Sequence, residues 1–284
     1  MQIFFQTFVN AISVSLIYIL FSLGLTLLVG VFGTFVFCIG ELFMLATFVT
    51  YFIYGQWGLS YGLAFIVAIG VVGLAGLVVE RGIFYPMRHR HHLDPALASF
   101  GAVMIMQTGA LLLWGGMPKG VPPVIGGQIT LGTIVFPLER LPIIIGGLLM
   151  LFFLMFFVKR TRLGLAIRAV QEDPDAATLQ GMNITTLRIV TWAVATSLVA
   201  VAGVLMAPVI GIDPFIGGSL LIKGFTVVIF GGLGSVAGAT IGGFALGFLD
   251  SFGMTYLGTY SYLFGFAIII LVLLLRPQGI MGRS

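Results

Sequence analysis

Two carboxylate side chains interrupt the long apolar stretches of this 284-residue chain. Glu41 stands at the start of one stretch, and Asp250 stands near the end of a glycine-rich one. A charged group at the centre of a membrane costs about 2.5–3.5 kcal/mol to insert, so it usually faces a cavity or a partner group. We therefore take Glu41 as a candidate solute contact, with a helix-start or interfacial role as the alternative. Asp250 and Lys223 are expected at the membrane interface, where a long lysine side chain can reach water.

The remaining polar patterns do not support catalysis or metal binding. All three histidines fall in a basic run at residues 88–92, which lacks Cys, Asp or Glu at ligand spacing, so we expect a solvated loop there. No H-E-x-x-H or G-x-S-x-G motif occurs, and no pair of carboxylates suits hydrolysis. The sequence therefore predicts no catalytic residue, no metal site and no enzyme.

One segment imitates a nucleotide-binding motif. Residues Gly232 to Ala237 match the pattern G-x-G-x-x-A, but that motif needs a soluble βαβ unit around it, and both flanks here are apolar. No phosphate-binding G-x-x-x-x-G-K-[ST] motif occurs in the chain. We expect no cofactor, and any ATP that drives this protein must be bound by partner subunits.

A polar segment at residues 159–186 separates two long apolar stretches. Within it, Pro174 suits the first turn of a helix, and Asp173 can act as the N-cap. Asp175 in that turn favours the helix dipole. The segment therefore predicts a short helix that begins at Asp173.

The same helix has features that suit contact with a partner. Ala176 and Ala177 offer a smooth face, and Gly181 can end the helix in a left-handed conformation. We interpret residues 172–181 as a docking helix, with an ordinary capped loop helix as the alternative.

Composition indicates a membrane protein. The chain is 60% hydrophobic and 8% charged, whereas soluble domains carry about 25% charged residues. A transmembrane helix needs about 20 apolar residues, and a barrel would show short alternating segments instead. We predict an all-α polytopic membrane protein, one domain over residues 1–284, with about eight transmembrane segments. The apolar stretches lie at 9–32, 36–55, 61–79, 95–114, 141–158, 187–207, 222–250 and 261–275.

The stretch 222–250 is too long for one span, and glycines in Gly231–Ser235 would break a helix. We predict a broken helical hairpin here whose segments fall short of a full crossing, since broken helices occur where they line a cavity. Residues 30–42 are expected to break similarly.

Small residues at a spacing of four suggest close helix contacts. Gly234, Gly238 and Gly242 form one such row, and Ala239, Gly243 and Gly247 form a second. A weaker series is Gly70, Gly73 and Gly76. Helix packing explains these rows, and a seam along which helices move is the functional alternative.

Basic residues set the orientation. Ten of the 13 lie in three segments, which the positive-inside rule places in the cytoplasm. They are Arg81, Arg88, Arg90, Lys159, Arg160, Arg162, Arg168, Arg188, Arg276 and Arg283. This clustering beside spans argues against nucleic-acid binding as the reason for the net charge of +4. A simple count leaves the N-terminus outside, and one break read differently would reverse it.

The chain resembles the permease subunits of branched-chain amino acid (Liv-type) ABC importers over nearly its whole length. The matching residues lie in the polar segment, the glycine-rich hairpin and three shorter loops. In the polar segment they are Arg162, Gly164, Arg168, Ala169, Glu172, Asp173, Ala176, Gly181 and Asn183. In the hairpin they are Lys223, Phe225, Gly231, Gly232, Gly234, Ser235, Gly238, Ala239, Gly242, Gly243 and Gly247. Elsewhere they are Glu80, Arg81, Pro86, Arg88, Gly211, Pro214, Gly217, Arg276, Pro277, Gly279 and Gly282.

The resemblance implies a permease subunit that pairs with a second, related permease, two cytoplasmic ATPases and a periplasmic solute-binding protein in a bacterial inner membrane. ATPase coupling is assigned to Arg168, Glu172, Asp173, Asp175, Ala176, Ala177 and Gly181. The solute pathway is assigned to Phe37, Gly40, Glu41, Gly231, Gly232, Gly234 and Ser235.

One departure from the family pattern bears on the solute. Val36 and Ile39 occupy positions where the family usually has Asn and His, so the expected pathway is more apolar. The wider family also carries urea, short amides and aromatic acids, and these stay open beside branched-chain amino acids. The rival class is a stand-alone secondary transporter or channel, which would leave the segment 159–186 unexplained. A membrane-embedded enzyme is a more distant alternative.

Overall fold

The computed structural model describes residues 2–260 except 89, 92, 132 and 133, together with 274 and 279–281. Its helices are α1 Gln2–Phe32, α2 Ile39–Thr50, α3 Tyr61–Val79, α4 Leu93–Trp114, α5 Leu141–Arg160, α6 Arg162–Glu172, α7 Pro174–Leu179, α8 Ile184–Met206, α9 Ile216–Gly231 and α10 Val236–Leu257. Helix α2 continues as a π-helix over Tyr51–Gln56, and α3 does so over Glu80–Phe84. Short 3-10 turns span Leu138–Arg140 and Gly258–Tyr260. Strands β1 Gln128–Leu131 and β2 Ile134–Pro137 form an antiparallel hairpin in which Gln128 pairs with Pro137.

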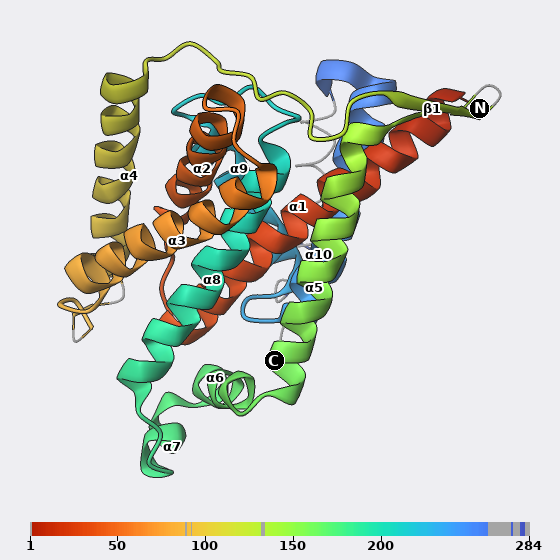
Figure 1. The fold of residues 1–284 in the computed structure, drawn as a ribbon. Helices are drawn as coiled ribbons and strands as arrows, with labels where there is room; N and C mark the ends of the chain where they lie inside the picture. Colours follow the sequence, from red (N-terminus) through yellow and green to blue (C-terminus); the bar gives the residue numbers. More distant parts are fainter. Residues whose placement is uncertain are drawn as a thin grey trace.

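Helices dominate the described chain, which confirms the predicted all-α membrane class (Figure 1). Six helices, namely α1, α3, α4, α5, α8 and α10, are long and apolar enough to cross a membrane by length and composition. Helix α9 is apolar but has only 16 residues, about 24 Å at 1.5 Å per residue. The predicted stretch 261–275 lies outside the described residues apart from Leu274, so it adds no helix to this set.

Both predicted helix breaks are present. Helix α1 ends at Phe32, where Gly33 adopts a φ of 65°, and α2 begins at Ile39. Helix α9 ends at Gly231 and is followed by Gly232 with a φ of 103°. Only glycine adopts such values without strain, so these residues determine where the helices stop.

The broken hairpin differs from the prediction in its dimensions. Ser235 caps α10 by accepting a hydrogen bond of 3.0 Å from the Gly238 N–H, as expected for an N-cap. Helix α9, however, begins at Ile216 rather than near 222, and α10 is long enough to span. Of the two hairpin helices only α9, with 16 residues, is shorter than a spanning helix requires.

Helix α1 forms the axis of the bundle and runs obliquely through its centre (Figure 1). Helices α5, α8, α9 and α10 contact it from several sides. Its middle is therefore fully buried, including Leu16, Ile17, Leu20 and Phe21. Helix α1 is therefore the central helix of the hydrophobic core.

Glycine rows form two tight seams along α10. Gly231 of α9 and Gly238 of α10 meet backbone to backbone, so a Cβ atom on either would overlap the other. On another face, Gly243 and Gly247 lie against α1, where a Cβ on Gly247 would come within 2.5 Å of the Ser15 Cα. The second predicted row therefore packs α10 onto α1, and the first packs α10 onto α9.

The weaker predicted series on α3 behaves differently along its length. Gly70 and Gly73 have nothing within 4 Å of a built Cβ, whereas one on Gly76 would lie 2.7 Å from the Trp192 Nε1. Only the last glycine of this series lets a neighbouring helix, α8, approach.

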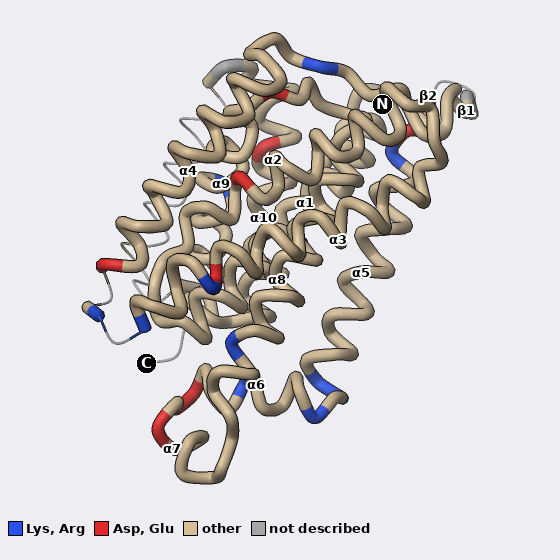
Figure 2. Tube along the Cα trace, turned by 60° about the vertical axis from the view of Figure 1, so that its left-hand side comes forward, with Lys and Arg blue, Asp and Glu red and all other residues tan. Residues whose placement is uncertain are grey.

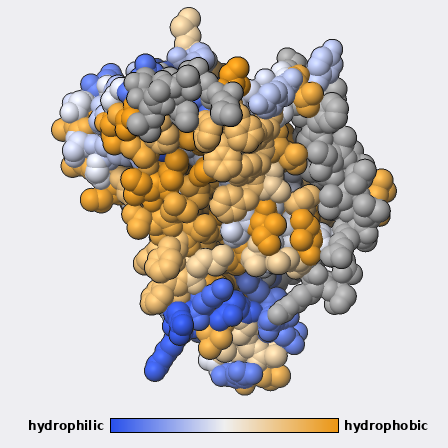
Figure 3. All heavy atoms as spheres, turned by 90° about the vertical axis from the view of Figure 1, so that its right-hand side faces the viewer, coloured by the Kyte–Doolittle hydropathy of each residue, from blue (hydrophilic) through white to orange (hydrophobic). Residues whose placement is uncertain are grey.

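Charge distinguishes the two ends of the bundle. Most Lys and Arg residues lie at the end formed by α6, α7 and the lower end of α3 (Figure 2). We call this the basic end. A broad apolar band lies above its hydrophilic side chains (Figure 3), as expected for a protein whose middle faces lipid. Of the ten Lys and Arg residues placed here from sequence, Arg276 and Arg283 lie outside the described residues, and the other eight are described.

A substitution at the α1–α10 seam should destabilise the isolated chain. Gly247→Leu must push α10 away from the Ser15 backbone, and overpacking of this kind costs about 1–3 kcal/mol. We expect a lower melting temperature in detergent, measured by size-exclusion chromatography after heating. Gly73→Leu is the matched control, because its side chain meets open space. Equal melting temperatures for the two variants would contradict this account of the seam.

Candidate transport pathway and docking segment

The break between α1 and α2 places non-helical backbone beside α4. The Phe37 N–H donates a hydrogen bond of 3.2 Å to the Ser99 Oγ. The Ser99 hydroxyl in turn donates to the Ala96 carbonyl oxygen at 2.7 Å. Polar backbone groups at membrane depth must be satisfied within the protein, so these bonds make the break tolerable.

Helix α2 starts against the start of α9. Gly40 and Gly217 lie so close that a Cβ on Gly40 would come within 2.5 Å of the Gly217 carbonyl oxygen. The predicted pathway residue Gly40 therefore serves as a packing contact in this structure. It brings the first turns of both helices together, and with them Glu41.

Glu41 is fully buried in the first turn of α2. Its Oε1 accepts a hydrogen bond of 2.9 Å from the Gln107 Nε2 of α4. Its Oε2 has no hydrogen-bond partner among the residues that the structure describes. A buried polar atom without a partner costs about 1–3 kcal/mol, more if it is charged. The site can therefore accept a further hydrogen bond from a cationic or N–H-bearing group.

Aromatic side chains surround the break. The Phe37 ring lies 5.4 Å from the Phe225 ring and 6.0 Å from the Phe100 ring, between centroids. Phe35 lies 5.5 Å from Phe225 and joins the same group. We call Phe35, Phe37, Phe100 and Phe225 the aromatic cluster. It provides an apolar surface on three elements next to the helix that carries Glu41.

A cavity of about 910 Å³ opens at the basic end. It reaches Phe35 of the aromatic cluster and is lined by Gly234 and Ser235 from the α9–α10 turn. Lys159 and Arg168 contribute positive charge to its wall. The cavity thus connects the break in α1–α2 with the break in α9–α10.

The predicted pathway residues therefore divide into separate groups. Phe37 and Glu41 belong to the region of the first break, and Gly234 and Ser235 line the cavity. Gly231 and Gly232 do not line it; they form the tight end of α9, where the Met281 N–H donates to the Gly231 carbonyl at 3.0 Å. Sequence reasoning missed Phe35, Phe100 and Gln107 as members of this region, and it named Phe225 only as a match to the family pattern. Gln107, a polar residue within the apolar stretch 95–114, was a signal that could have indicated this region.

The docking helix has the predicted caps. The Asp173 Oδ1 accepts hydrogen bonds from the N–H groups of Asp175 and Ala176, each at 2.9 Å. Gly181 has a φ of 80° and follows the helix, as its predicted left-handed conformation requires. Pro174 occupies the first turn of α7. The structure adds a second, longer helix, α6, between α5 and α7.

Contrary to the prediction from sequence, helix α7 does not present Ala177 to a partner. Ala177 is only 3% exposed and packs into the hydrophobic core of its own chain, so it supports the helix rather than offering a face to a partner. Leu179 is 90% exposed, which is unusual for leucine on a polar segment. Arg168 and Glu172 lie on the cavity wall. The outward face of α7 therefore consists of Asp175, Thr178 and Leu179.

Two charges expected separately at the interface are paired. The Lys223 Nζ lies 2.7 Å from the Asp250 Oδ2 and 2.9 Å from its Oδ1. The Tyr18 hydroxyl donates to the same carboxylate at 2.8 Å. The pair joins α9 to α10 and to α1, so these charges hold the hairpin in the bundle.

Known proteins with similar sequences are transport permeases. The sequence matches the family described as "Branched-chain amino acid transport system / permease component" over residues 7–273. The chain is 32% identical to the high-affinity branched-chain amino acid transport system permease protein BraD of Pseudomonas aeruginosa, covering 99% of this chain and 96% of that protein. It is 31% identical to LivH, a permease protein of the same description from Escherichia coli K12, with the same coverage.

A solved structure supports the fold. The chain resembles PsaBC from Streptococcus pneumoniae in complex with Fab with a TM-score of 0.54 and 13% identity, over 95% of this chain and 91% of that one. The curated relatives are transport permeases and not enzymes, and with the apolar helices they make this chain a multi-pass inner-membrane protein. The chain belongs to the family of permease components of branched-chain amino acid transport systems.

Proposed function

We propose that this chain is one permease subunit of an ABC importer that moves a branched-chain amino acid across the inner membrane by alternating access. It pairs with a second, related permease, and two ATPase subunits bind at the basic end. A periplasmic binding protein delivers the solute at the opposite end. Since the chain has no P-loop motif, the work of transport enters through contacts with the ATPases.

The observation that carries this proposal is the α6–α7 segment between two spanning helices. It presents Leu179, 90% exposed, on a capped helix at the end where basic residues gather. An exposed apolar side chain rimmed by polar residues is typical of a protein–protein contact. A stand-alone transporter has no need for such a surface, so this feature favours an ATPase-driven importer.

The proposed solute is consistent with the residues around the break. The aromatic cluster offers an apolar surface, and the free oxygen of Glu41 can accept a hydrogen bond from an ammonium group. In this state Glu41 is buried, so contact requires α4 to move away from α2. Helix α4 has most of its surface exposed, which supports such a movement.

The departures at Val36 and Ile39 do not argue against an amino acid. Both side chains are fully buried in the main hydrophobic core, where apolar residues are satisfied. Glu41 is different, because its Oε2 is a buried polar atom that needs a hydrogen bond and has no partner among the described residues. Urea, short amides and aromatic acids should be tested as competitors of leucine uptake.

Leu179→Asp should separate the permease from its ATPases. A charge replaces the most exposed apolar side chain of α7, and losing a central contact weakens an interface by roughly tenfold or more. The measurement is co-purification of the ATPase subunits with a tagged permease, followed by ATP-dependent leucine uptake in proteoliposomes. We expect both to be lost while the permease remains folded.

Leu59→Asp is the matched control, because Leu59 is an exposed leucine in the loop between α2 and α3, away from the basic end. It should leave co-purification intact. Normal ATPase binding by Leu179→Asp would contradict the docking role. Leucine uptake by the purified permease alone, without ATPase subunits, would instead favour a stand-alone transporter or channel.

Glu41→Gln should impair transport without disrupting assembly. The neutral amide keeps the size of the side chain but loses the charge, and a hydrogen bond to a charged group contributes about 1.5–3 kcal/mol, so leucine uptake should fall roughly tenfold or more. Uptake is measured at saturating binding protein, with Glu139→Gln as a control outside the pathway. Unchanged uptake by Glu41→Gln would assign the residue a purely structural role.

A further inference from the structure

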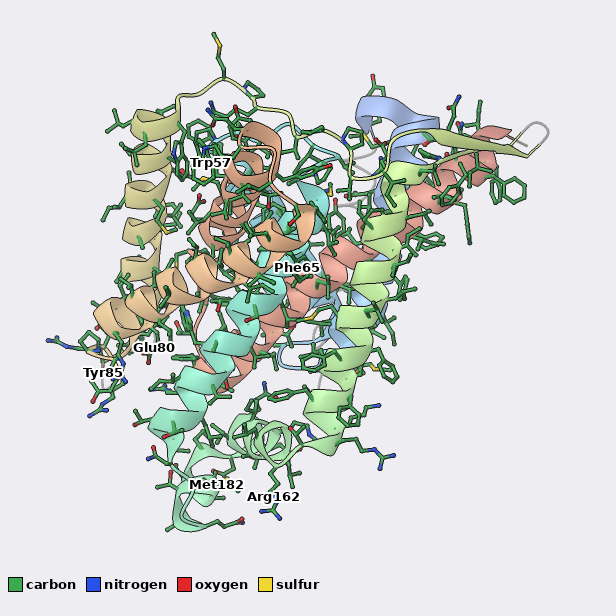
Figure 4. All side chains as sticks on the ribbon, in the orientation of Figure 1. Trp57, Phe65, Glu80, Tyr85, Arg162 and Met182 are labelled. Carbon is green, nitrogen blue, oxygen red and sulfur yellow. The ribbon has the colours of Figure 1, made fainter. Side chains whose placement is uncertain are left out.

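Glu80 is a buried acid that the transport pathway does not use. It lies at the lower end of α3 (Figure 4) and is 1% exposed. Its Oε2 accepts no hydrogen bond from any described residue. The nearest cation, the Arg81 Nε, is 3.7 Å away and belongs to a side chain that is 55% exposed. Since an unpaired buried carboxylate is strongly unfavourable, Glu80 needs a second positive charge.

Arg188 of α8 carries the second positive charge that acts on Glu80. This attraction acts through space, because no ion pair within 4 Å joins the two described side chains. The guanidinium carbon of Arg188 also lies 4.8 Å from the centre of the Phe32 ring, in a cation–π contact. The Arg188 Nε is buried and donates to no described group. Arg188 thus places a positive charge of α8 against an aromatic ring of α1, and that charge favours the buried Glu80 carboxylate of α3.

Aromatic contacts extend this arrangement. The Phe32 ring lies 5.7 Å from Phe84 and 5.5 Å from Trp192, and those two rings lie 4.9 Å apart. Trp192 stands one helical turn beyond Arg188, so both side chains occupy one face of α8. We call Phe32, Glu80, Phe84, Arg188 and Trp192 the Glu80 cluster. It joins α1, α3 and α8 at one point.

Tight backbone packing fixes α3 and α8 beside this cluster. A Cβ on Gly76 would lie 2.5 Å from the Thr196 Cγ2 and 2.7 Å from the Trp192 Nε1. The two helices are therefore packed too closely at this level for a larger side chain at position 76.

The position of the cluster links the docking segment to the first break. Helix α8 follows α7 directly, and the Met182 N–H donates to the carbonyl oxygen of buried Ala177 at 3.2 Å. Arg188 lies in the second turn of α8. On the other side, Phe32 is the last residue of α1, and Gly33 begins the break that carries Phe35 and Phe37.

We propose that Glu80 and Arg188 are positioning residues that transmit the movement of α7 through Phe32 to the α1–α2 break. When the ATPases displace α7, the start of α8 moves, and Arg188 carries the end of α1 with it. The aromatic cluster then rearranges. This inference rests on the proposed docking function of α7.

The test measures the movement of the break directly. The single native cysteine is replaced (Cys38→Ala), and Phe35→Cys, which lines the cavity, becomes the reporter. In proteoliposomes with its partner subunits, the rate of maleimide labelling is compared without nucleotide and with ATP plus vanadate. We expect the reporter protein to change its labelling rate about fivefold or more, the lower range of ordinary coupling between sites.

The key variant is Glu80→Gln combined with Arg188→Gln. Removing both charges leaves no buried charge unpaired, so the double variant should still fold and bind the ATPases. We expect it to hydrolyse ATP while its reporter keeps less than half of the nucleotide-dependent change. Arg188→Lys should show the same defect, because an ammonium group lacks the planar face that stacks on Phe32. Arg81→Gln is the matched control: it touches the same acid from the solvent side and should keep the full response.

The outcomes separate this inference from the proposed function. A full reporter response in the double variant would overturn the inference, and so would failure of that variant to assemble with the ATPases, because the cluster would then be a folding requirement. Leu179→Asp in the same reporter background should lose both assembly and response. If that variant responds normally, the docking proposal fails; if it loses the response while the double variant keeps it, only the Glu80 cluster is excluded.

Discussion

Backbone polar groups inside a membrane must find partners within the protein, and this requirement determines where the helices of this chain can stop. Each break is therefore supported by specific contacts. Phe37 donates to Ser99 at the first break, and Ser235 accepts from the Gly238 N–H at the second. Glycines with positive φ end the helices at both places. Because the breaks are restricted in this way, the cavity at the basic end forms between them.

Helix α1 and the helices around it are closely packed, whereas α4 at the periphery of the bundle is not. Helix α1 is enclosed by four other helices, and α10 meets α1 and α9 through glycine seams that leave no space for side chains. Helix α4, in contrast, has most of its apolar surface exposed and touches α2 near Glu41. A bundle that combines a close-packed axis with a loosely attached helix can open at one place without losing its core.

The features readable from sequence are local ones. Spans, helix breaks and the caps Asp173 and Gly181 depend on residues close together in the chain, so apolar runs and glycine positions predict them. The Lys223–Asp250 pair and the Glu80 cluster join residues far apart, and they depend on which helices become neighbours. The inward direction of Ala177 depends on its packing against the core of the chain, which residue spacing within α7 does not reveal. The prediction of a short segment was wrong for α10, which continues to Leu257, seven residues past the end of the apolar stretch at 250.

The ion pair between α9 and α10 also bears on how the protein enters the membrane. A sixteen-residue segment with a lysine near its middle is a poor substrate for insertion alone, since such a charge costs about 2.5–3.5 kcal/mol at the bilayer centre. Asp250 neutralises that charge only when both helices are present, at 2.7 Å. During biosynthesis the translocon is therefore expected to release the two helices as a unit, and the ribosome must complete α10 before α9 can settle into lipid.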